Sequence, residues 1–380
     1  MSEKIVLSLM SGLFQGGSPI IHSDIIGALH QQGRQRHAAL SFTSQVSREH
    51  TVQRIEDSVP HGILTRARLG LHWLNRQPDD EYSPMDLVYA ELLLRGADVL
   101  FSLKEQPLTL LRDIGPVDRP LVVALHRSDP ENQGSGLDAL TEFAKDGTLS
   151  AAVCCAHSVQ RAYHEATGIP VELLPVIPNG VDTDRFTPSE HRRERVRDAL
   201  SISPDAPVVF LSARFDGMKN IPLFVATAGR FLQAHPETNF IMCGAGMTYE
   251  NGDLQNMLDR HIPEELHSRF KRLGIRTRMA ALYAAADIAV LTSKFGEAAP
   301  LSLMEAMSCG VIPVTTDVGD SALIAGDERL VGGDDPDDLA ERWSFAYTHR
   351  DELRPAVLAR REEFDSRLCY RRYGDLLDAV

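Results

Sequence analysis

Two carboxylates in one stretch of the sequence have the type and spacing to bind a polyhydroxylated ligand. Glu297 and Glu305 are separated by seven residues, and Pro300 between them marks the expected start of a helix. Ionised carboxylates are strong hydrogen-bond acceptors, so each could hold vicinal hydroxyls of a sugar or a ribose. The N-terminus of the helix also favours an anionic or hydroxyl-rich ligand. The alternative is that Ser302 and Glu305 form a helix-capping box and that Glu297 is only solvated.

Two cations occupy another strand-to-helix connection. Arg214 and Lys219 follow the apolar run 207–212 and precede an expected helix. Two cations in one loop could neutralise a diphosphate without a metal ion. The alternative is that both are ordinary surface charges. A further apolar run ends at Cys243-Gly244-Ala245-Gly246. These glycines permit close approach of a ligand, but they do not form a Gly-x-Gly-x-x-Gly fingerprint.

The elements that must position these residues alternate along most of the chain, as short apolar runs and amphipathic stretches. The predicted strands are 4–10, 37–42, 98–103, 120–126, 151–156, 171–176, 207–212, 239–243, 270–273, 287–292 and 311–315. Predicted helices begin at Ser18-Pro19 and cover 83–96, 222–234, 253–261, 278–285 and 300–309. Such alternation is typical of parallel α/β domains, in which ligands bind at the carboxyl ends of strands. The pattern restarts after Pro188, so we expect two similar α/β units with the ligand in the cleft between them.

Composition narrows the class of protein further. A chain of 380 residues is long for one hydrophobic core, which again favours two domains. The net charge of −14 argues against a nucleic-acid-binding protein. No apolar run is long enough to cross a membrane, and the first run is too short for a signal peptide. The five cysteines have no metal-binding spacing, so we expect a reduced, cytoplasmic protein without a structural metal.

Two more motifs complete a set that resembles a known family. Residues 176–188 read Val-Ile-Pro-Asn-Gly-Val-Asp-Thr-Asp-Arg-Phe-Thr-Pro, and residues 305–310 read Glu-Ala-Met-Ser-Cys-Gly. Together with the Arg214/Lys219 loop and the spacing of Glu297 and Glu305, they resemble retaining glycosyltransferases of family 4. The resemblance is specific over about 176–330 and looser before that.

The resemblance implies a fold, a domain division and a donor. The fold is α/β of the GT-B type, with two Rossmann-like, doubly wound parallel-sheet domains facing a deep cleft. Residues 1–185, together with the last helix from about 362 to 380, would form the acceptor-binding domain. Residues 190–361 would bind a nucleoside-diphosphate-sugar as substrate, and no separate cofactor is required.

Roles for individual residues follow from the same resemblance. Arg214 and Lys219 would contact the diphosphate, and Glu305 the ribose hydroxyls. Glu297 would hold the transferred sugar. The other predicted donor contacts are Gly16, Gly17, Gly244, the base-binding segment Leu273, Gly274 and Ile275, and the sugar-binding loop Ala298, Ala299, Pro300 and Leu301. That loop departs from the Gly-Phe-Gly common in the family, which leaves the identity of the sugar open.

In the first domain, His126 ends a predicted strand and matches a family histidine at the catalytic cleft. With Arg214, Lys219 and Glu297 it completes the predicted catalytic set, in which it would position the donor sugar or the acceptor. The alternative for His126 is a structural role. Lys104 and Glu105 are further acceptor-side candidates, with an exposed loop pair as the alternative.

The predicted activity is a metal-independent hexosyltransferase (EC 2.4) that acts with retention. It would move a hexose-type sugar from a UDP donor, with GDP or ADP donors as alternatives, to a hydroxyl of a small soluble acceptor such as an aminocyclitol or a saccharide. A GT-B phosphorylase and a non-catalytic nucleotide-sugar-binding protein are the other candidates. Asp182-Thr-Asp184 resembles a metal-binding Asp-x-Asp but falls inside the interdomain motif, and Asp334–Asp338 most simply opens a helix, so we predict no metal site.

One basic segment, residues 63–76, has no role in the predicted donor site. Residues 63–76 contain three arginines and could form an amphipathic helix at a membrane surface. Gly70 interrupts the segment and Lys is absent from it, so a solvated helix face is favoured over membrane contact. The oligomeric state is left open.

Overall fold

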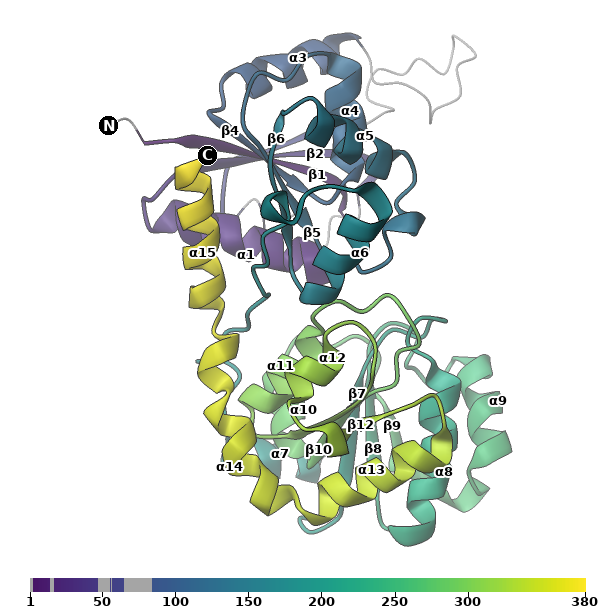
Figure 1. The fold of residues 1–380 in the computed structure, drawn as a ribbon. Helices are drawn as coiled ribbons and strands as arrows, with labels where there is room; N and C mark the ends of the chain where they lie inside the picture. Colours follow the sequence, from purple (N-terminus) through teal and green to yellow (C-terminus); the bar gives the residue numbers. More distant parts are fainter. Residues whose placement is uncertain (1–2, 14–16, 47–54, 56, 65–83) are drawn as a thin grey trace. The chain divides into compact units, whose positions relative to one another are not determined.

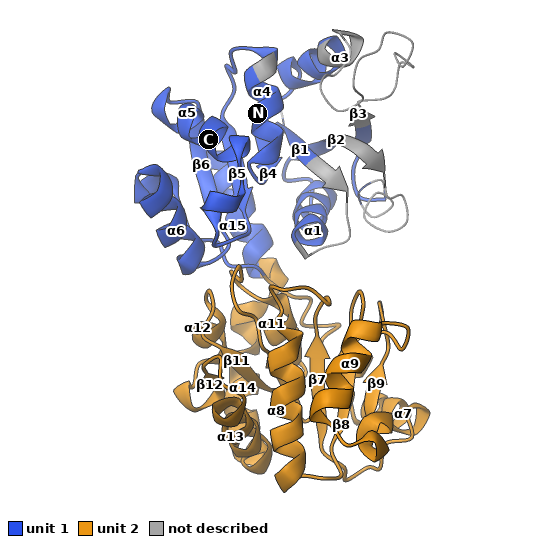
Figure 2. Cartoon of the chain, turned by 90° about the vertical axis from the view of Figure 1, so that its right-hand side faces the viewer, with its two compact units in different colours: residues 1–179, 368–380 blue, residues 180–367 orange. Residues whose placement is uncertain are grey.

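The computed structural model describes residues 3–13, 17–46, 55, 57–64 and 84–380. The chain divides into two compact units, residues 1–179 with 368–380 and residues 180–367 (Figure 2). Helix α15 (Ser366–Ala379) supplies the C-terminal part of the first unit. It is attached there by Arg34, whose guanidinium pairs with Asp375 at 2.6 Å and Asp378 at 2.8 Å.

The first unit is built on a parallel sheet of six strands in the order β3-β2-β1-β4-β5-β6 (Figure 1). The strands are β1 (Ile5–Leu13), β2 (Arg36–Val46), β3 (His61–Leu64), β4 (Val99–Leu103), β5 (Leu121–Leu125) and β6 (Leu149–Cys154). The helices are α1 (Gly17–Gln31), α3 (Pro84–Arg95), α4 (Gln106–Ile114), α5 (Ser135–Lys145), α6 (His157–Thr167) and α15. Every residue of β4 and β5 is buried, because helices cover both faces of a parallel sheet.

The second unit repeats this design with the order β12-β11-β10-β7-β8-β9. Its strands are β7 (Val208–Ser212), β8 (Asn239–Cys243), β9 (Phe270–Arg272), β10 (Ile288–Leu291), β11 (Ile312–Thr316) and β12 (Val331–Gly332). Its helices are α7 (Glu190–Ala199), α8 (Ile221–Ala234), α9 (Gly252–His261), α10 (Met279–Ala285), α11 (Leu301–Ser308), α12 (Ser321–Ala325), α13 (Pro336–Thr348) and α14 (Arg350–Ala359). The fully buried Trp343 of α13 packs against Phe224 and Phe231 of α8, with ring centroids 5.6 and 5.9 Å apart.

Both sheets are doubly wound. Successive strands are added first on one side of the starting strand and then on the other, so each sheet has one point where the strand order reverses. That place lies between β1 and β4 in the first unit and between β7 and β10 in the second. As a general rule, the loops that leave the carboxyl ends of the two strands at such a place run in opposite directions, and ligands bind in the crevice between them. In the second unit this singles out the loops after β7 and β10.

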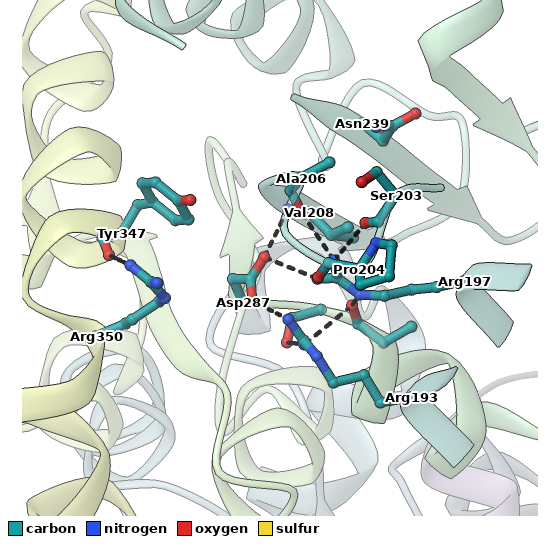
Figure 3. Close-up of polar contacts among 12 residues, drawn as sticks. Arg193, Arg197, Ser203, Pro204, Ala206, Val208, Asn239, Asp287, Tyr347 and Arg350 are labelled. Atoms are coloured by element: carbon teal, nitrogen blue, oxygen red, sulfur yellow. Dashed lines mark hydrogen bonds and ion pairs between the residues drawn. The ribbon is translucent and has the colours of Figure 1, made fainter. Parts of the chain in front are cut away.

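At the opposite, amino ends of β7 and β10, a buried ion cluster fastens α7 to the sheet (Figure 3). Arg197 donates to the carbonyls of Ala285, Ser203, Pro204 and Ala206 at 2.8–3.1 Å. Its remaining nitrogen pairs with Asp287 at 2.9 Å. Asp287 also accepts from the N–H of Val208, the first residue of β7, at 2.8 Å.

The predicted elements agree with the structure at most positions, and two of them are wrong. Val171–Leu173 forms a 3-10 helix instead of a strand, because Pro170 sets its start, and Val176 makes only an isolated bridge to Cys154. Ile63 and Leu64 belong to β3, so the basic helix predicted over 63–76 is wrong at its start, and its remainder lies outside the described residues.

The strands β3 and β12 lie at the edges of the two sheets and were not predicted. The helix predicted at the acidic run 334–338 is confirmed. Asp335 caps α13 by accepting from the N–H groups of Asp337 and Asp338 at 2.9 Å.

Candidate functional site

Lys219 and Glu297 form an ion pair at the carboxyl ends of β7 and β10, although 78 residues separate them in the sequence. The ammonium of Lys219 contacts Oε1 of Glu297. The two side chains are 14% and 7% exposed, so the pair is largely shielded from water. The structure therefore brings together the predicted diphosphate-binding cation and the predicted sugar-binding carboxylate at the crevice of the second sheet.

The loop after β7 is held in place by its neighbour. Thr292 Oγ1 donates to the carbonyl of Lys219 at 3.0 Å, and the N–H of Lys294 donates to the carbonyl of Met218 at 2.8 Å. Within the loop, Asp216 accepts from the N–H of Lys219 at 3.0 Å. The position of the Lys219 backbone is therefore set by β10 as much as by its own strand.

Arg214 points toward solvent in the same loop. Its side chain is 54% exposed and pairs with Asp216 at 3.1 Å.

The residue after β8, Gly244, can only be glycine. Its φ is +140°, and a Cβ at this position would lie 2.0 Å from the carbonyl oxygen of Ala213. This contact keeps the loops after β7 and β8 close together.

The predicted sugar-binding loop is tightly enclosed. Ala298 and Ala299 are buried, Pro300 is the N-cap of α11, and Leu301 is its first residue. Gly319, with φ of +65°, packs so closely that a Cβ would lie 2.4 Å from the carbonyl oxygen of Glu297. The N-cap of α11 has no side-chain hydrogen bond, so the capping box considered for Ser302 and Glu305 is wrong.

Glu305 lies inside α11 and is partly exposed. Burial of its carboxyl raises the pKa to about 7, against the opposing influence of the Tyr283 hydroxyl and the charge of Arg185. Tyr283 is fully buried, and its ring packs edge-on against Phe210 at 4.7 Å. Glu305 therefore lies near the aromatic Tyr283 and the cationic Arg185 of the same unit. With a pKa of about 7, its carboxyl group gains or loses its proton near neutral pH.

The predicted base-binding segment follows β9. The N–H of Leu273 donates to the carbonyl of Met242 at 2.9 Å, and the N–H of Gly274 donates to Met247 at 2.8 Å. Ile275 is 56% exposed and presents an apolar side chain to solvent. These hydrogen bonds hold the segment beside the end of β8.

In the first unit, His126 follows β5, and its Nε2 atom is buried with no hydrogen-bond partner among the described residues. Burial and the charge of Lys104 lower its pKa to about 3, so the ring is neutral at pH 7. His22 of α1 lies near it and was not predicted. Its ring hydrogen-bonds Ser8 Oγ at 3.1 Å, and burial together with His126 lowers its pKa to about 3.

Lys104 and Glu105 do not form an exposed loop pair, so that alternative is wrong. Glu105 is 1% exposed, and burial raises its pKa to about 7. Lys104 has a φ of +64°, which is a strained conformation for a non-glycine residue. Gly136 makes room for Glu105, since a Cβ at that glycine would lie 2.9 Å from the Glu105 Cβ. Lys104, Glu105 and His126 all follow the carboxyl ends of neighbouring strands.

Other predicted residues can be placed briefly. Gly17 is the first residue of α1, and Gly16 lies outside the described residues. Asp182 accepts from the N–H groups of Asp184 and Arg185 at 3.1 and 3.0 Å, which closes a turn. Over the described part of the chain, no three His, Cys, Asp or Glu side chains gather in a way that could hold a metal ion, and no helix is long and apolar enough to cross a membrane.

A protein-family model matches most of the second unit. Residues 192–357 match the model of the family described as glycosyl transferases group 1. This match lies entirely within the second unit, residues 180–367. The predicted resemblance to glycosyltransferases is thereby confirmed for the group 1 domain, which carries Arg214, Lys219, Glu297 and Glu305.

Relatives with curated names match over part of their length. D-inositol 3-phosphate glycosyltransferase 2 of Catenulispora acidiphila is 32% identical over 177 residues, which cover 42% of this chain and 39% of the relative. UDP-Gal:alpha-D-GlcNAc-diphosphoundecaprenol alpha-1,3-galactosyltransferase of Escherichia coli is 27% identical over 157 residues, which cover 40% of this chain and 38% of the relative. The chain thus spans about two fifths of the length of the curated relatives it matches.

Solved structures resemble the whole chain. Anabaena Alr3699/HepE, crystallised with UDP, matches with a TM-score of 0.80 at 20% identity, covering 99% of this chain and 100% of that one. WaaG, a glycosyltransferase involved in lipopolysaccharide biosynthesis, matches with a TM-score of 0.70 at 13% identity, covering 98% and 99%. At these identities the likeness concerns the fold. Together with the two doubly wound sheets, it confirms the predicted GT-B fold.

Proposed function

We propose that this protein is a retaining glycosyltransferase that moves a hexose-type sugar from a nucleoside diphosphate, with UDP favoured, to a hydroxyl of a small acceptor. The observation that carries the proposal is the Lys219–Glu297 pair at the crevice of the group 1 domain. A cation and a carboxylate side by side suit a ligand that has a phosphate next to a sugar hydroxyl.

Each part of the donor has a matching group in the second unit. Lys219 and the exposed Arg214 contact the diphosphate, and Glu297 with the backbone of residues 298–301 holds the sugar. Glu305 accepts hydrogen bonds from the ribose, and the segment 273–275 lies along the base. The first unit, with α15, binds the acceptor.

The reaction exchanges one bond at the anomeric carbon for another. The bond from this carbon to the diphosphate oxygen breaks, and negative charge develops on the leaving group, where Lys219 and Arg214 stabilise it. The acceptor oxygen then bonds to the same face of the sugar, and its proton passes to the departing phosphate. No carboxylate nucleophile is needed, and the two cations provide the neutralisation that a metal ion supplies in other transferases. His126, neutral at pH 7, positions the sugar or the acceptor by a hydrogen bond.

Names of similar proteins support the choice of ligands to test first. HepE was crystallised with UDP-glucose, and several relatives are named as D-inositol 3-phosphate glycosyltransferases. We therefore favour UDP-glucose among the donors. We add a cyclitol to the saccharides and aminocyclitols as a candidate acceptor.

The test is an incubation in EDTA with UDP-, GDP- or ADP-glucose and, in turn, D-inositol 3-phosphate, an aminocyclitol, a saccharide and inorganic phosphate. Nucleotide release that requires a hydroxyl acceptor, with an α-linked product by NMR, is the expected result. Formation of glucose 1-phosphate would instead identify a phosphorylase. Donor binding without turnover with any acceptor would identify a binding protein, and absence of donor binding would reject the site itself.

A further inference from the structure

Three consecutive residues after β10 connect both members of the Lys219–Glu297 pair. Thr292 and Lys294 hold the loop after β7 by the hydrogen bonds to the Lys219 and Met218 carbonyls described above. The residue between them, Ser293, points to the other member. Its hydroxyl lies 2.6 Å from Glu297 Oε1, which is the same oxygen that the Lys219 ammonium contacts.

The surroundings of Ser293 make this hydrogen bond directional. An ionised carboxylate can only accept, so the Ser293 hydroxyl is the donor. Ser293 is 1% exposed, so little water competes with it. Its own carbonyl accepts from Thr316 Oγ1 at 2.6 Å, which fixes the Ser293 backbone to the neighbouring strand β11.

We infer that Ser293 is a positioning residue for the donor sugar, because it fixes the Glu297 carboxylate beside Lys219. A glutamate side chain has three rotatable bonds, and the flexible ammonium of Lys219 restricts them weakly. The buried Ser293 hydroxyl adds a second fixed donor on the same oxygen, so the carboxylate is oriented before a ligand arrives. The inference rests on the proposed function of Glu297 and adds a residue that does not itself touch the substrate.

The test compares Ser293→Ala with Ser308→Ala. Ser308 is a fully buried serine of α11 in the same unit, and its hydroxyl has no partner among the described residues, so it is a matched control for burial. Loss of one hydrogen bond to a charged group predicts a weakening of UDP-glucose binding by about tenfold in Ser293→Ala. Binding of UDP, which lacks the sugar, is expected to change by less than about twofold, since Glu297 is assigned to the sugar. Ser293→Thr keeps the hydroxyl and should restore most of the affinity.

A second readout does not depend on the donor. A crystal structure of Ser293→Ala should show the Glu297 carboxylate in a different orientation, with the protein otherwise folded. The inference is overturned if the carboxylate keeps its place, or if Ser293→Ala binds UDP-glucose and UDP like the wild type. If the wild type binds no nucleotide-sugar, the proposed function fails separately, and the orientation of Glu297 in the variant still decides the positioning role.

Discussion

The two ends of the second sheet use the same kinds of charge for different purposes. At the amino ends of β7 and β10, Arg197 and Asp287 have side chains only 3% and 4% exposed, and the guanidinium donates to backbone carbonyls of four residues. At the carboxyl ends, Lys219 and Glu297 are also paired, but Arg214 beside them is 54% exposed and Glu305 has a raised pKa. The cluster at the amino ends is satisfied largely by backbone carbonyls and stabilises the architecture, whereas the charges at the carboxyl ends are the ones that we propose for ligand binding.

The largest expected effect is on stability, when Arg197 of the amino-end cluster is removed. Arg197→Ala removes one of the two arginines that pair with the buried Asp287, the other being Arg193 at 2.7 Å, and it takes the donor away from the backbone carbonyls that Arg197 contacts. Together these losses should cost about 3–5 kcal/mol of unfolding free energy. Urea unfolding measures the change. Arg230→Ala, which breaks the exposed Arg230–Asp337 pair, is the control and should be close to wild type. Equal effects of the two variants would refute the architectural role of the amino-end cluster.

Removing Lys219 should affect activity far more than the fold. Lys219→Ala deletes the cation assigned to the leaving diphosphate, and transfer should fall by about a hundredfold or more. Circular dichroism should report a folded protein. Lys145→Ala, an exposed lysine of α5, serves as the control for loss of a lysine. Wild-type turnover of Lys219→Ala would remove this residue from the site.

The raised pKa of Glu305 predicts opposite effects of pH on binding and stability. Binding of UDP-glucose should strengthen as pH rises through about 7, because ionisation removes the O–H donor of the carboxyl group and makes both oxygens charged acceptors for the ribose hydroxyls. The folded-state pKa lies above the unfolded value near 4.5, so this group's contribution to stability is full below pH 4.5 and is lost as pH rises through about 7.

Glu305→Gln removes the ionisation and tests both effects. At pH 8 we expect about tenfold weaker donor binding together with a higher free energy of unfolding than wild type. Titration calorimetry and urea unfolding at pH 5 and 8 provide the measurements. A variant as unstable as wild type at pH 8, or one with unchanged donor affinity, would contradict the assignment.

The smallest expected effect concerns His126 in the first unit. His126→Asn should lower turnover by about fivefold, the value of one neutral hydrogen bond, without changing the donor KM. Because its pKa is about 3, His126 stays neutral, and the pH–rate profiles of the variant and the wild type should have the same shape above pH 5. A change of shape near pH 6–7 would show that His126 titrates during the reaction.

The fold was largely predictable because each strand and helix has a local signature. The apolar runs at 239–243 and 288–291 are strands with almost the predicted ends. The edge strands β3 and β12 were missed because an edge position demands fewer apolar residues and they are short. The strand predicted at 171–176 was wrong, because its apolar residues suggested a strand whereas Pro170 precedes a 3-10 helix.

The candidate site was predictable in residue type but not in its supporting contacts. Arg214, Lys219, Glu297 and Glu305 stand in motifs with recognisable spacing. Ser293 and His22 carry no such signal, since buried serines and histidines are common in α/β cores. Glu105 looked like an exposed loop residue because it follows a lysine after a strand, whereas the packing of Gly136 against it places it inside the first unit.

By itself, the sequence determined which residues occupy the loops after strands, because apolar periodicity and helix-start signals are local. The tertiary structure decided which of those loops meet. Lys219 and Glu297 make contact only because the doubly wound order sets β7 beside β10, and a helical crossover is needed to join parallel strands. It also raised the pKa of Glu305, since a pKa depends on the burial and the neighbours that distant segments provide.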